Sequence, residues 1–368
     1  GDQRKCKKTG KDRIEMTDEV FLEELLGAVT VSGYEEEGQA VIRKYMEPLA
    51  DEVRTDDIGD TVCVLGPDRD FRILMTAHLD EIGLMVTTVN ERGRLQVIDR
   101  GGIVPATYPG HRVKVMTERG PVYGVVESYR DFFKKEGGLK TSDFLIDIGV
   151  DSKEEACELV EPGAPVVLDT GFCKAAGGRF LSRALDDRLG VFIIMEAFKK
   201  ARKRGCACGV YSAATVGEET TKNGAYWTAS RVKPDLAVVV DVTYTSDCIG
   251  MNAADSGEVT LGGGPVLCNS PIVSKRLNRM MRECASRIGV KVQTEAASRL
   301  SYTDADKIHF AGEGIPTVLV SIPLRYMHHP AEMADEKDVE GCIDLIAEFL
   351  VSWGISGRKT GFGEPDKE

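Results

Sequence analysis

Hydrophobic residues follow a helical spacing near the start of the chain. Between residues 18 and 29 the apolar positions lie three or four apart: Phe21, Leu22, Leu25, Leu26 and Val29. Residues at this spacing share one face of a helix, so a helix is predicted here. A second helix is predicted over 35–45, and the short apolar run 71–77 is typical of a buried strand. The beginning of the chain therefore has an α/β pattern.

The pattern changes between about residues 83 and 169. Apolar stretches such as 84–89, 112–116 and 121–126 are short, rich in β-branched residues and separated by glycines and prolines. Only 152–159 has a helical pattern. This texture predicts a β-rich module.

After Ser182, helices and strands alternate again. Helices are predicted over 187–204, 223–230, 271–288 and 339–353, and strands over 209–215, 236–242, 290–294 and 315–322. Such alternation indicates an α/β fold with a mostly parallel sheet covered by helices. The β-rich module is then an insertion within the sequence of one α/β domain.

The composition limits the kinds of partner. With 47 basic and 59 acidic side chains the net charge is −12, which disfavours nucleic acid and an anionic membrane surface. No run of about 20 apolar residues is long enough to span a bilayer, and the charged first residues do not resemble a secretory signal. The ten cysteines include no CxxC pair, and we interpret them as reduced thiols of a cytoplasmic protein.

Several common catalytic motifs are missing from the sequence. There is no GxSxG elbow, no GxxxxGK[ST] loop and no HExxH pair. The nearest approach to a GxGxxG fingerprint, GEGIPT at 312–317, lacks the third glycine. These absences disfavour serine hydrolases of the α/β-hydrolase type, P-loop enzymes, dinucleotide-binding enzymes and HExxH metalloproteases.

Histidines and acidic residues gather at the ends of the predicted elements. Only five histidines occur, and His78 stands directly after the strand predicted over 71–77. Four other groups lie close to strand ends or helix starts: Asp186-Asp187, Glu218-Glu219, Asp241 and His328. Because sites in open α/β sheets form beyond the carboxyl ends of the strands, these groups are predicted to converge.

Two histidines with several carboxylates suit Zn²⁺, Mn²⁺ or Co²⁺. Two metal ions share such a set most simply through one bridging carboxylate, and a free carboxylate can then act as general base. Each group also has an ordinary interpretation: a helix cap for Asp186-Asp187, solvated loop acids for Glu218-Glu219, a hydrogen-bonded core residue for His78. Asp241 follows three valines and is costly to bury unless it is paired.

A series of motifs across about residues 25–349 carries a family resemblance. In order they are VSGYEEE (31–37), AHLDEIGLMV (77–86), ALDDR (184–188) with Gly190, EE (218–219) with GA (224–225), VDVT (240–243), GP (264–265), TDA (303–305), RYMH (325–328) and PAE (330–332). The chain resembles the tetrahedral aminopeptidases, metallopeptidase family forty-two, often labelled glutamyl aminopeptidases or endoglucanase-like proteins. AHLDEIG and ALDDR are the most specific of these motifs.

The resemblance assigns roles to the matching positions. The implied metal ligands are His78, Asp186, Glu219, Asp241 and His328, with Asp186 bridging. Glu218 is the implied general base, and Asp80 is expected to hydrogen-bond His78 and fix its tautomer. His329, beside the expected ligand, is the alternative ligand.

The glutamate loop departs from the family pattern. Gly217 stands where the family commonly has glutamine, and TTKNGA (220–225) replaces valine, glycine, any residue, arginine, glycine and alanine. The spacing is kept, so the departures concern loop conformation and substrate preference rather than metal binding. Related dinuclear peptidases hold the peptide after the bridging aspartate in cis, which predicts a cis bond between Asp186 and Asp187.

The resemblance implies a dinuclear metalloaminopeptidase that removes the N-terminal residue of peptides. A metal-bridging water, activated by Glu218, is the implied nucleophile. Two divalent metal ions per subunit are expected, with Zn²⁺ first and Co²⁺ or Mn²⁺ as alternatives. The other functions considered are a different metal-dependent hydrolase, either a deacetylase or an endoglucanase-like enzyme, and a non-catalytic scaffold. A scaffold should lack a ligand or the base, and none is missing.

The resemblance also implies the domain organisation. Residues 16–83 and 172–355 are expected to form a dinuclear zinc-peptidase-like catalytic domain, interrupted by a β-rich dimerisation domain at 84–171. Dimers are expected to assemble into a hollow dodecamer that admits peptide substrates. Residues 1–15 and 356–368 match no family motif and are expected to be flexible.

Overall fold

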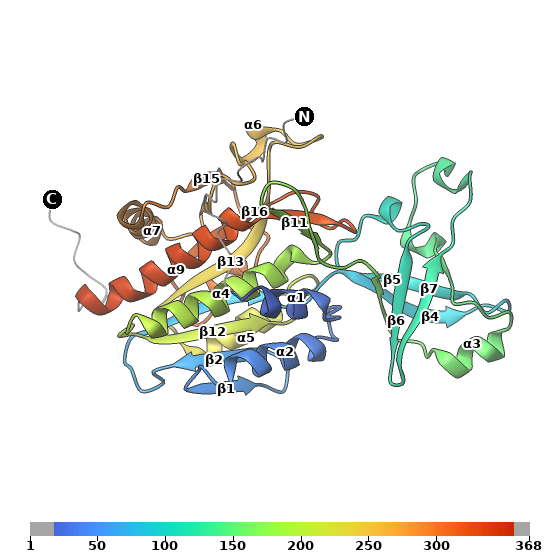
Figure 1. Ribbon diagram of the computed structural model, residues 1–368, viewed down its shortest axis with the longest axis horizontal. Coiled ribbons are helices and arrows are strands. Elements are labelled where there is room, and N and C mark those ends of the chain that lie inside the picture. The colour runs from blue at the N-terminus through green and yellow to red at the C-terminus, as the bar shows by residue number, and fades with distance from the viewer. Residues whose placement is uncertain (1–17, 357–368) are drawn as a thin grey trace, which may run out of the picture.

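The computed structural model describes residues 18–356, which form one large sheet, a small three-stranded sheet and a closed barrel (Figure 1). The predicted fold class is confirmed, because a mostly parallel sheet is covered by helices and a β-rich part is set beside it. The ends expected to be flexible, 1–15 and 356–368, lie outside the described residues, apart from Ser356 at the end of the last helix.

The large sheet has the strand order β1-β2-β12-β3-β13-β16-β14-β15. Its central strands β12, β3, β13 and β16 are parallel, whereas the pairs β1–β2, β2–β12 and β14–β16 are antiparallel and β14–β15 is parallel. The strands are β1 (Glu52–Thr55), β2 (Thr61–Leu65), β3 (Arg72–His78), β12 (Gly209–Thr215), β13 (Leu236–Tyr244), β14 (Val266–Asn269), β15 (Gln293–Ala296) and β16 (Thr317–Leu324). The parallel centre places the carboxyl ends of four strands at one edge.

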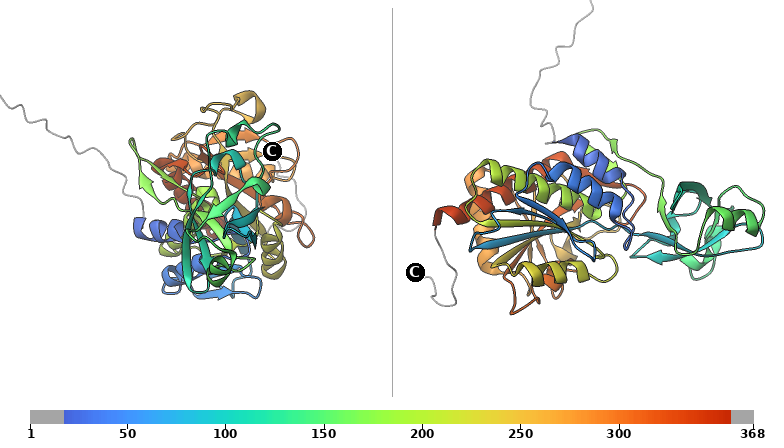
Figure 2. Two further views of the ribbon diagram at one scale, coloured as in Figure 1. Left: turned by 90° about the vertical axis from the view of Figure 1, so that its right-hand side faces the viewer. Right: turned by 90° about the horizontal axis from the view of Figure 1, so that it is seen from below.

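Helices cover both faces of this sheet (Figure 2). The helices on one face are α1 (Glu19–Gly27), α2 (Glu36–Met46), α4 (Leu185–Lys203), α7 (Lys275–Ile288) and α9 (Glu336–Ser356); those on the other are α5 (Asn223–Val232) and α8 (Ala305–Ile308). Within β3, Ile73 and Met75 belong to the hydrophobic core under the first group of helices. Leu74 belongs to the core on the opposite face, under α5 and α8. A strand buried on both faces needs a continuous apolar run, which is why 71–77 predicted a buried strand.

Six antiparallel strands close the barrel in the order β4-β5-β8-β7-β6-β9. The strands are β4 (Gly83–Val89), β5 (Leu95–Arg100), β6 (Arg112–Thr117), β7 (Gly120–Val126), β8 (Leu145–Asp147) and β9 (Pro165–Leu168), accompanied by α3 (Lys153–Leu159) and the 3₁₀ turns Pro105–Thr107, Phe132–Lys134 and Thr141–Asp143. Leu84, Val113 and Phe144 belong to a hydrophobic core separate from those of the large sheet. Because β4 follows β3 closely, the barrel lies beside the carboxyl ends of the parallel strands.

The small sheet holds the start of α4 in place. Its strands are β10 (Cys173–Lys174), β11 (Arg179–Ser182) and β17 (Glu332–Asp335). The short helix α6 (Ala253–Ser256), between β13 and β14, is not part of this sheet. Because β11 leads directly into α4, its pairing with β17 brings Glu332 close to Asp186.

One predicted helix begins later than expected. The helix predicted from residue 271 starts at Lys275, where the Ser274 hydroxyl accepts a hydrogen bond from the Leu277 N–H. Within residues 18–356 no helix is long and apolar enough to cross a membrane. The nine cysteines in this range form no disulfide.

Candidate metal centre

The predicted site residues meet at the carboxyl edge of the large sheet. His78 is the last residue of β3 and pairs with Thr215, the last residue of β12. Asp241 lies on the neighbouring strand β13, and Glu218 and Glu219 follow β12. Asp186 is in the first turn of α4, and His328 follows β16. Parallel pairing therefore brings together residues that are far apart in the sequence.

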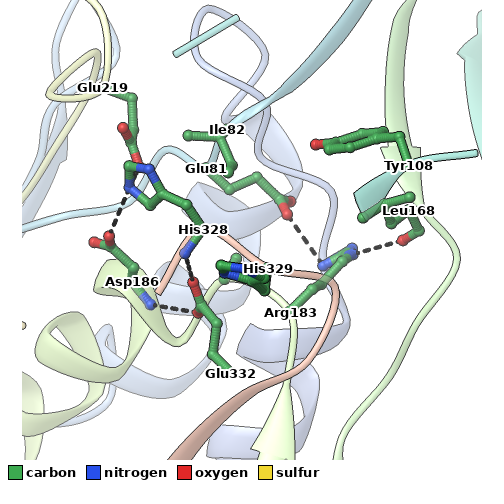
Figure 3. Close-up of a pocket in the computed structure, with 11 residues that line it drawn as sticks. Glu81, Ile82, Tyr108, Leu168, Arg183, Asp186, Glu219, His328, His329 and Glu332 are labelled. Atoms are coloured by element: carbon green, nitrogen blue, oxygen red, sulfur yellow. Dashed lines mark hydrogen bonds and ion pairs between the residues drawn. The ribbon is translucent and has the colours of Figure 1, made fainter. Parts of the chain in front are cut away.

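Asp186 lies between the two histidines. One of its carboxylate oxygens, Oδ1, is 3.0 Å from His78 Nε2. The other, Oδ2, is 3.1 Å from His328 Nε2 (Figure 3). Asp186 and His78 are buried, while His328 is partly exposed. A single carboxylate therefore faces an imidazole nitrogen with each of its oxygens.

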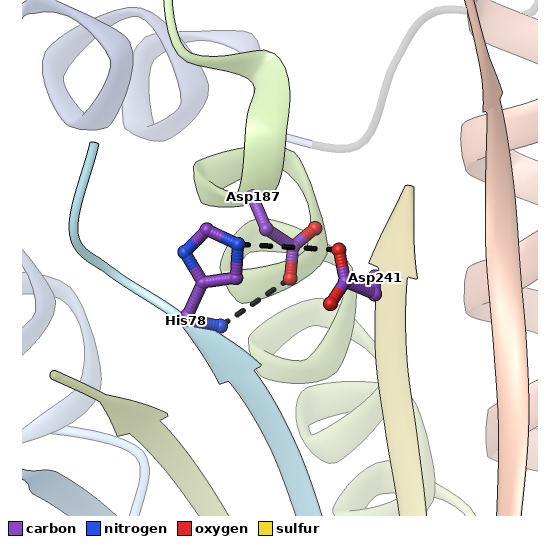
Figure 4. A group of neighbouring side chains, drawn as sticks. All are labelled: His78, Asp187 and Asp241. Carbon is purple, nitrogen blue, oxygen red and sulfur yellow. Dashed lines mark hydrogen bonds and ion pairs between the residues drawn. The ribbon is translucent and has the colours of Figure 1, made fainter. Parts of the chain in front are cut away.

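Two groups of potential ligands share His78. His78, Asp186 and Glu219 each offer an atom within 4.8 Å of the others, and the same is true of His78, Asp187 and Asp241 (Figure 4). The sequence predicted that the Asp186-Asp187 pair would converge with the other groups, but it gave Asp187 no ligand role. Its two carboxylate oxygens accept hydrogen bonds from the backbone N–H groups of His78 and Gly190. The two adjacent aspartates were the feature of the sequence that could have indicated a ligand role for Asp187, but a helix cap also explains such a pair.

The two adjacent glutamates form their closest histidine contacts with different residues. Glu219 Oε1 is 3.4 Å from His328 Nε2, and Glu218 Oε2 is 3.9 Å from His78 Nε2. Both carboxylates are poorly exposed. Adjacent residues of the loop after β12 can thus reach different histidines.

Asp80 orients both histidine and glutamates. His78 Nδ1 is 3.0 Å from the main-chain carbonyl oxygen of Asp80 and 3.4 Å from its carboxylate Oδ1. The carboxylate accepts hydrogen bonds from the backbone N–H groups of Glu218, at 2.9 Å, and Glu219, at 3.1 Å. The second role was not predicted, because nothing in the sequence shows that the loop after β12 folds over Asp80.

His328 and His329 point to different partners. The Nδ1–H of His328 donates to the carbonyl oxygen of Gly102 at 2.8 Å, which leaves Nε2 facing Asp186. His329 Nδ1 is instead 2.9 Å from the carbonyl oxygen of Met327. Neither His328 nor His329 belongs to the two potential ligand groups found within residues 18–356, so what distinguishes the two histidines is that His328 Nε2 faces Asp186 and Glu219.

Glu332 fastens two of the cluster residues. Its carboxylate accepts the backbone N–H of Asp186 at 3.1 Å and the backbone N–H of His328 at 2.8 Å. Nearby, the buried Glu81 carboxylate lies 3.3 Å from the guanidinium of Arg183 (Figure 3). The sequence analysis gave no role to Glu81 or Glu332, although both lie within motifs of the family resemblance.

Electrostatics favour a cation in the cluster. Burial raises the pKa of Asp241 to about 7 although His78 opposes the shift, and burial also raises the pKa of Glu219 against the effect of His328. Burial lowers the pKa of His328, but hydrogen bonds with Asp186 and Glu219 outweigh it and raise that pKa to about 12. Two imidazoles therefore do not neutralise the buried carboxylates, and a divalent cation among these nitrogen and oxygen donors would supply the missing charge.

The backbone around Asp186 is unusual in one further respect. The peptide bond between Asp186 and Asp187 is cis, which confirms the prediction made from the resemblance.

Comparison with known proteins identifies the family. The chain matches the model of the M42 glutamyl aminopeptidase family over residues 59–345. The chain belongs to this family. Lysyl aminopeptidase from Pyrococcus furiosus is 29% identical over 344 residues, which cover 91% of this chain and 97% of the relative.

Solved structures of the same kind share the fold. The TET aminopeptidase from the marine sediment archaeon Thaumarchaeota archaeon SCGC AB-539-E09 is 32% identical, with a TM-score of 0.86 over 91% of this chain and 96% of the other. The Pyrococcus horikoshii TET1 peptidase, which can assemble into a tetrahedron or a large octahedral shell, is 31% identical, with a TM-score of 0.79 over 90% of this chain and 98% of the other.

Family membership settles the class of reaction. This M42 protein is a metallo-aminopeptidase, a hydrolase of peptide bonds, as the sequence predicted. The endoglucanase-like, deacetylase and scaffold alternatives are not favoured by these relatives or by a cluster in which the carboxylates face histidines.

Proposed function

We propose that this aminopeptidase holds two divalent metal ions, bridged by Asp186. The observation that supports this most strongly is the position of the Asp186 carboxylate, with one oxygen toward His78 and the other toward His328. Asp241 would complete the donors around His78, and Glu219 those around His328. Zn²⁺ is the first candidate because imidazole and carboxylate donors suit it, with Co²⁺ and Mn²⁺ as alternatives.

Glu218 is proposed as the general base. When bound, the metal ions would polarise the carbonyl of the first peptide bond and lower the pKa of a water molecule. Glu218 would accept the proton of the attacking water and pass it to the nitrogen of the leaving amine. Asp80 would hold the backbone of the glutamate loop in the required position, since it binds the N–H groups of both glutamates.

The proposed reaction is tested with matched chromogenic substrates. We expect release of the chromogenic amine from an aminoacyl derivative with a free α-amino group and no release from its N-acetylated counterpart. An aminopeptidase requires the free amine, whereas a deacetylase would act on the acetyl group and an endoglucanase on a soluble cellulose derivative. Hydrolysis of either alternative substrate at a higher kcat/KM than the aminoacyl derivative would contradict the proposal.

The barrel is proposed as the dimerisation domain, with boundaries 84–171. Three apolar side chains stand exposed on its strands: Ile98, Tyr123 and Val125 are 45%, 54% and 39% exposed. Apolar surface of this kind marks interaction sites when it is contiguous. Dimers joined in this way would supply the twelve equivalent positions of a tetrahedral assembly, the shape reported for the P. horikoshii relative.

Light scattering measures the proposed assembly directly. We expect a species many times heavier than the 40.1 kDa chain, and Tyr123→Glu should shift the mass to smaller species because a buried carboxylate opposes association. A wild-type protein that stays monomeric at micromolar concentration would contradict the dodecamer. The cytoplasmic location stays a prediction from the sequence.

A further inference from the structure

Lys222 contacts the proposed base from outside the cluster. It stands four residues after Glu218, at the N-cap of α5, with the left-handed backbone angles φ 58° and ψ 20°. Its ammonium forms an ion pair with Glu218 Oε1 and donates to the carbonyl oxygen of Tyr302 at 2.7 Å. The Lys222 side chain is 24% exposed and that of Glu218 only 7%. The family pattern leaves position 222 open, so the resemblance gives this lysine no role.

The backbone around Lys222 is fixed. The N–H groups of Thr221 and Lys222 both donate to the carbonyl oxygen of Gly217, at 2.8 Å and 2.7 Å. The carbonyl that anchors the ammonium is also held, because the Tyr302 N–H donates to the Asp306 carboxylate at 2.9 Å. The ammonium therefore lies between two fixed segments, unlike the lysine of a solvated ion pair, which usually contributes little.

The ion pair with Lys222 restricts the orientation of the Glu218 carboxylate. Its backbone N–H is bound by Asp80, but Gly217 (φ 68°) precedes it, and glycine allows the loop other conformations. The ion pair occupies Oε1 of the carboxylate, whereas Oε2 points toward His78 Nε2 at 3.9 Å. One oxygen is thus held from outside, and the other is left facing the cluster.

We infer that Lys222 is a positioning residue for Glu218, a role that rests on the proposed function of Glu218 as base. The lysine would keep the free oxygen of the base within reach of the attacking water. Outer partners of this kind typically change activity by about 10–100-fold. The expected defect is therefore in kcat, with little change in substrate binding or metal content.

Lys222→Met and Lys222→Arg test the inference. We expect Lys222→Met to lower kcat by roughly tenfold or more. The metal content and the KM for an aminoacyl substrate whose side chain is uncharged should not change. Lys222→Arg should recover most of the rate because it restores a cation. The matched control is Lys233→Met at the other end of α5, which removes an exposed lysine that also has a positive φ of 49°. The control should keep the wild-type rate.

A double mutant separates this inference from the proposed function. If Lys222 acts only through Glu218, adding Lys222→Met to Glu218→Gln should cause little further loss, so the two effects should not multiply. Full multiplication, a normal kcat in Lys222→Met, or a raised KM with unchanged kcat would each overturn the positioning role. A wild-type rate in Glu218→Gln alone would instead overturn the proposed base.

Discussion

Glu218→Gln is expected to lower kcat by about 10²–10⁴-fold while the protein keeps its metal content. The amide occupies the same volume and can still accept a hydrogen bond, but it cannot take the proton of the attacking water. Excess metal should not restore the rate, because no metal donor has been removed. Steady-state kinetics and elemental analysis of the purified variant measure the two expectations together.

Glu219→Ala is the matched comparison, since it changes the neighbouring residue of the same loop. The substitution removes the carboxylate that lies 3.4 Å from His328 Nε2, so metal content should fall and added metal should restore part of the activity. Gly217 makes the loop permissive, and a shift of one residue would exchange the two roles. Loss of metal from Glu218→Gln with retention in Glu219→Ala would show that the roles are reversed.

Removal of metal by a chelator is expected to abolish nearly all peptidase activity. The polarising charge would be lost, and the buried carboxylates of Asp186 and Asp241 would keep the two histidines as their ion-pair partners among residues 18–356. The melting temperature should also fall, since metal that binds only the folded chain stabilises it. Zn²⁺, Co²⁺ and Mn²⁺, added back separately, should differ in the rate they restore.

Two variants serve as controls for chelation. When the chelator removes the metal, the melting temperature of Glu218→Gln should fall as far as that of the wild type, because its metal-binding residues are intact. The melting temperature of Glu219→Ala should fall less, because this variant binds less metal at the start. Full activity in a chelated sample shown to be metal-free by elemental analysis would contradict the metal requirement of the proposed site.

Sequence patterns predicted the elements with strong periodicity. The apolar run before His78 and the helical spacing near Phe21 each correspond to an observed element, β3 and α1. Strands such as β1 and β14 were missed because short strands owe their conformation to neighbouring strands rather than to their own residues.

The sequence predicted which side chains form the candidate site, but not the groups that hold those side chains in position. Scarce histidines and strand-end acids indicated which residues might meet, because the carboxyl ends of parallel strands share one edge. The groups that orient them could not be found this way. The Gly102 carbonyl and the second role of Asp80 depend on contacts across more than a hundred residues, and a backbone carbonyl has no signature in the sequence.

If His328 is a ligand as proposed, its contact with Gly102 gives the barrel a part in the chemistry. Gly102 follows β5, and its carbonyl selects the imidazole tautomer that turns Nε2 toward Asp186. A Cβ at position 102 would meet the His328 ring at 3.3 Å, so even alanine would crowd this approach. A chain without the barrel would keep every candidate ligand, but it would lose the Gly102 carbonyl, which orients the His328 imidazole. The two parts are therefore not interchangeable building blocks, and a barrel exchanged between relatives must bring a matching loop after β5.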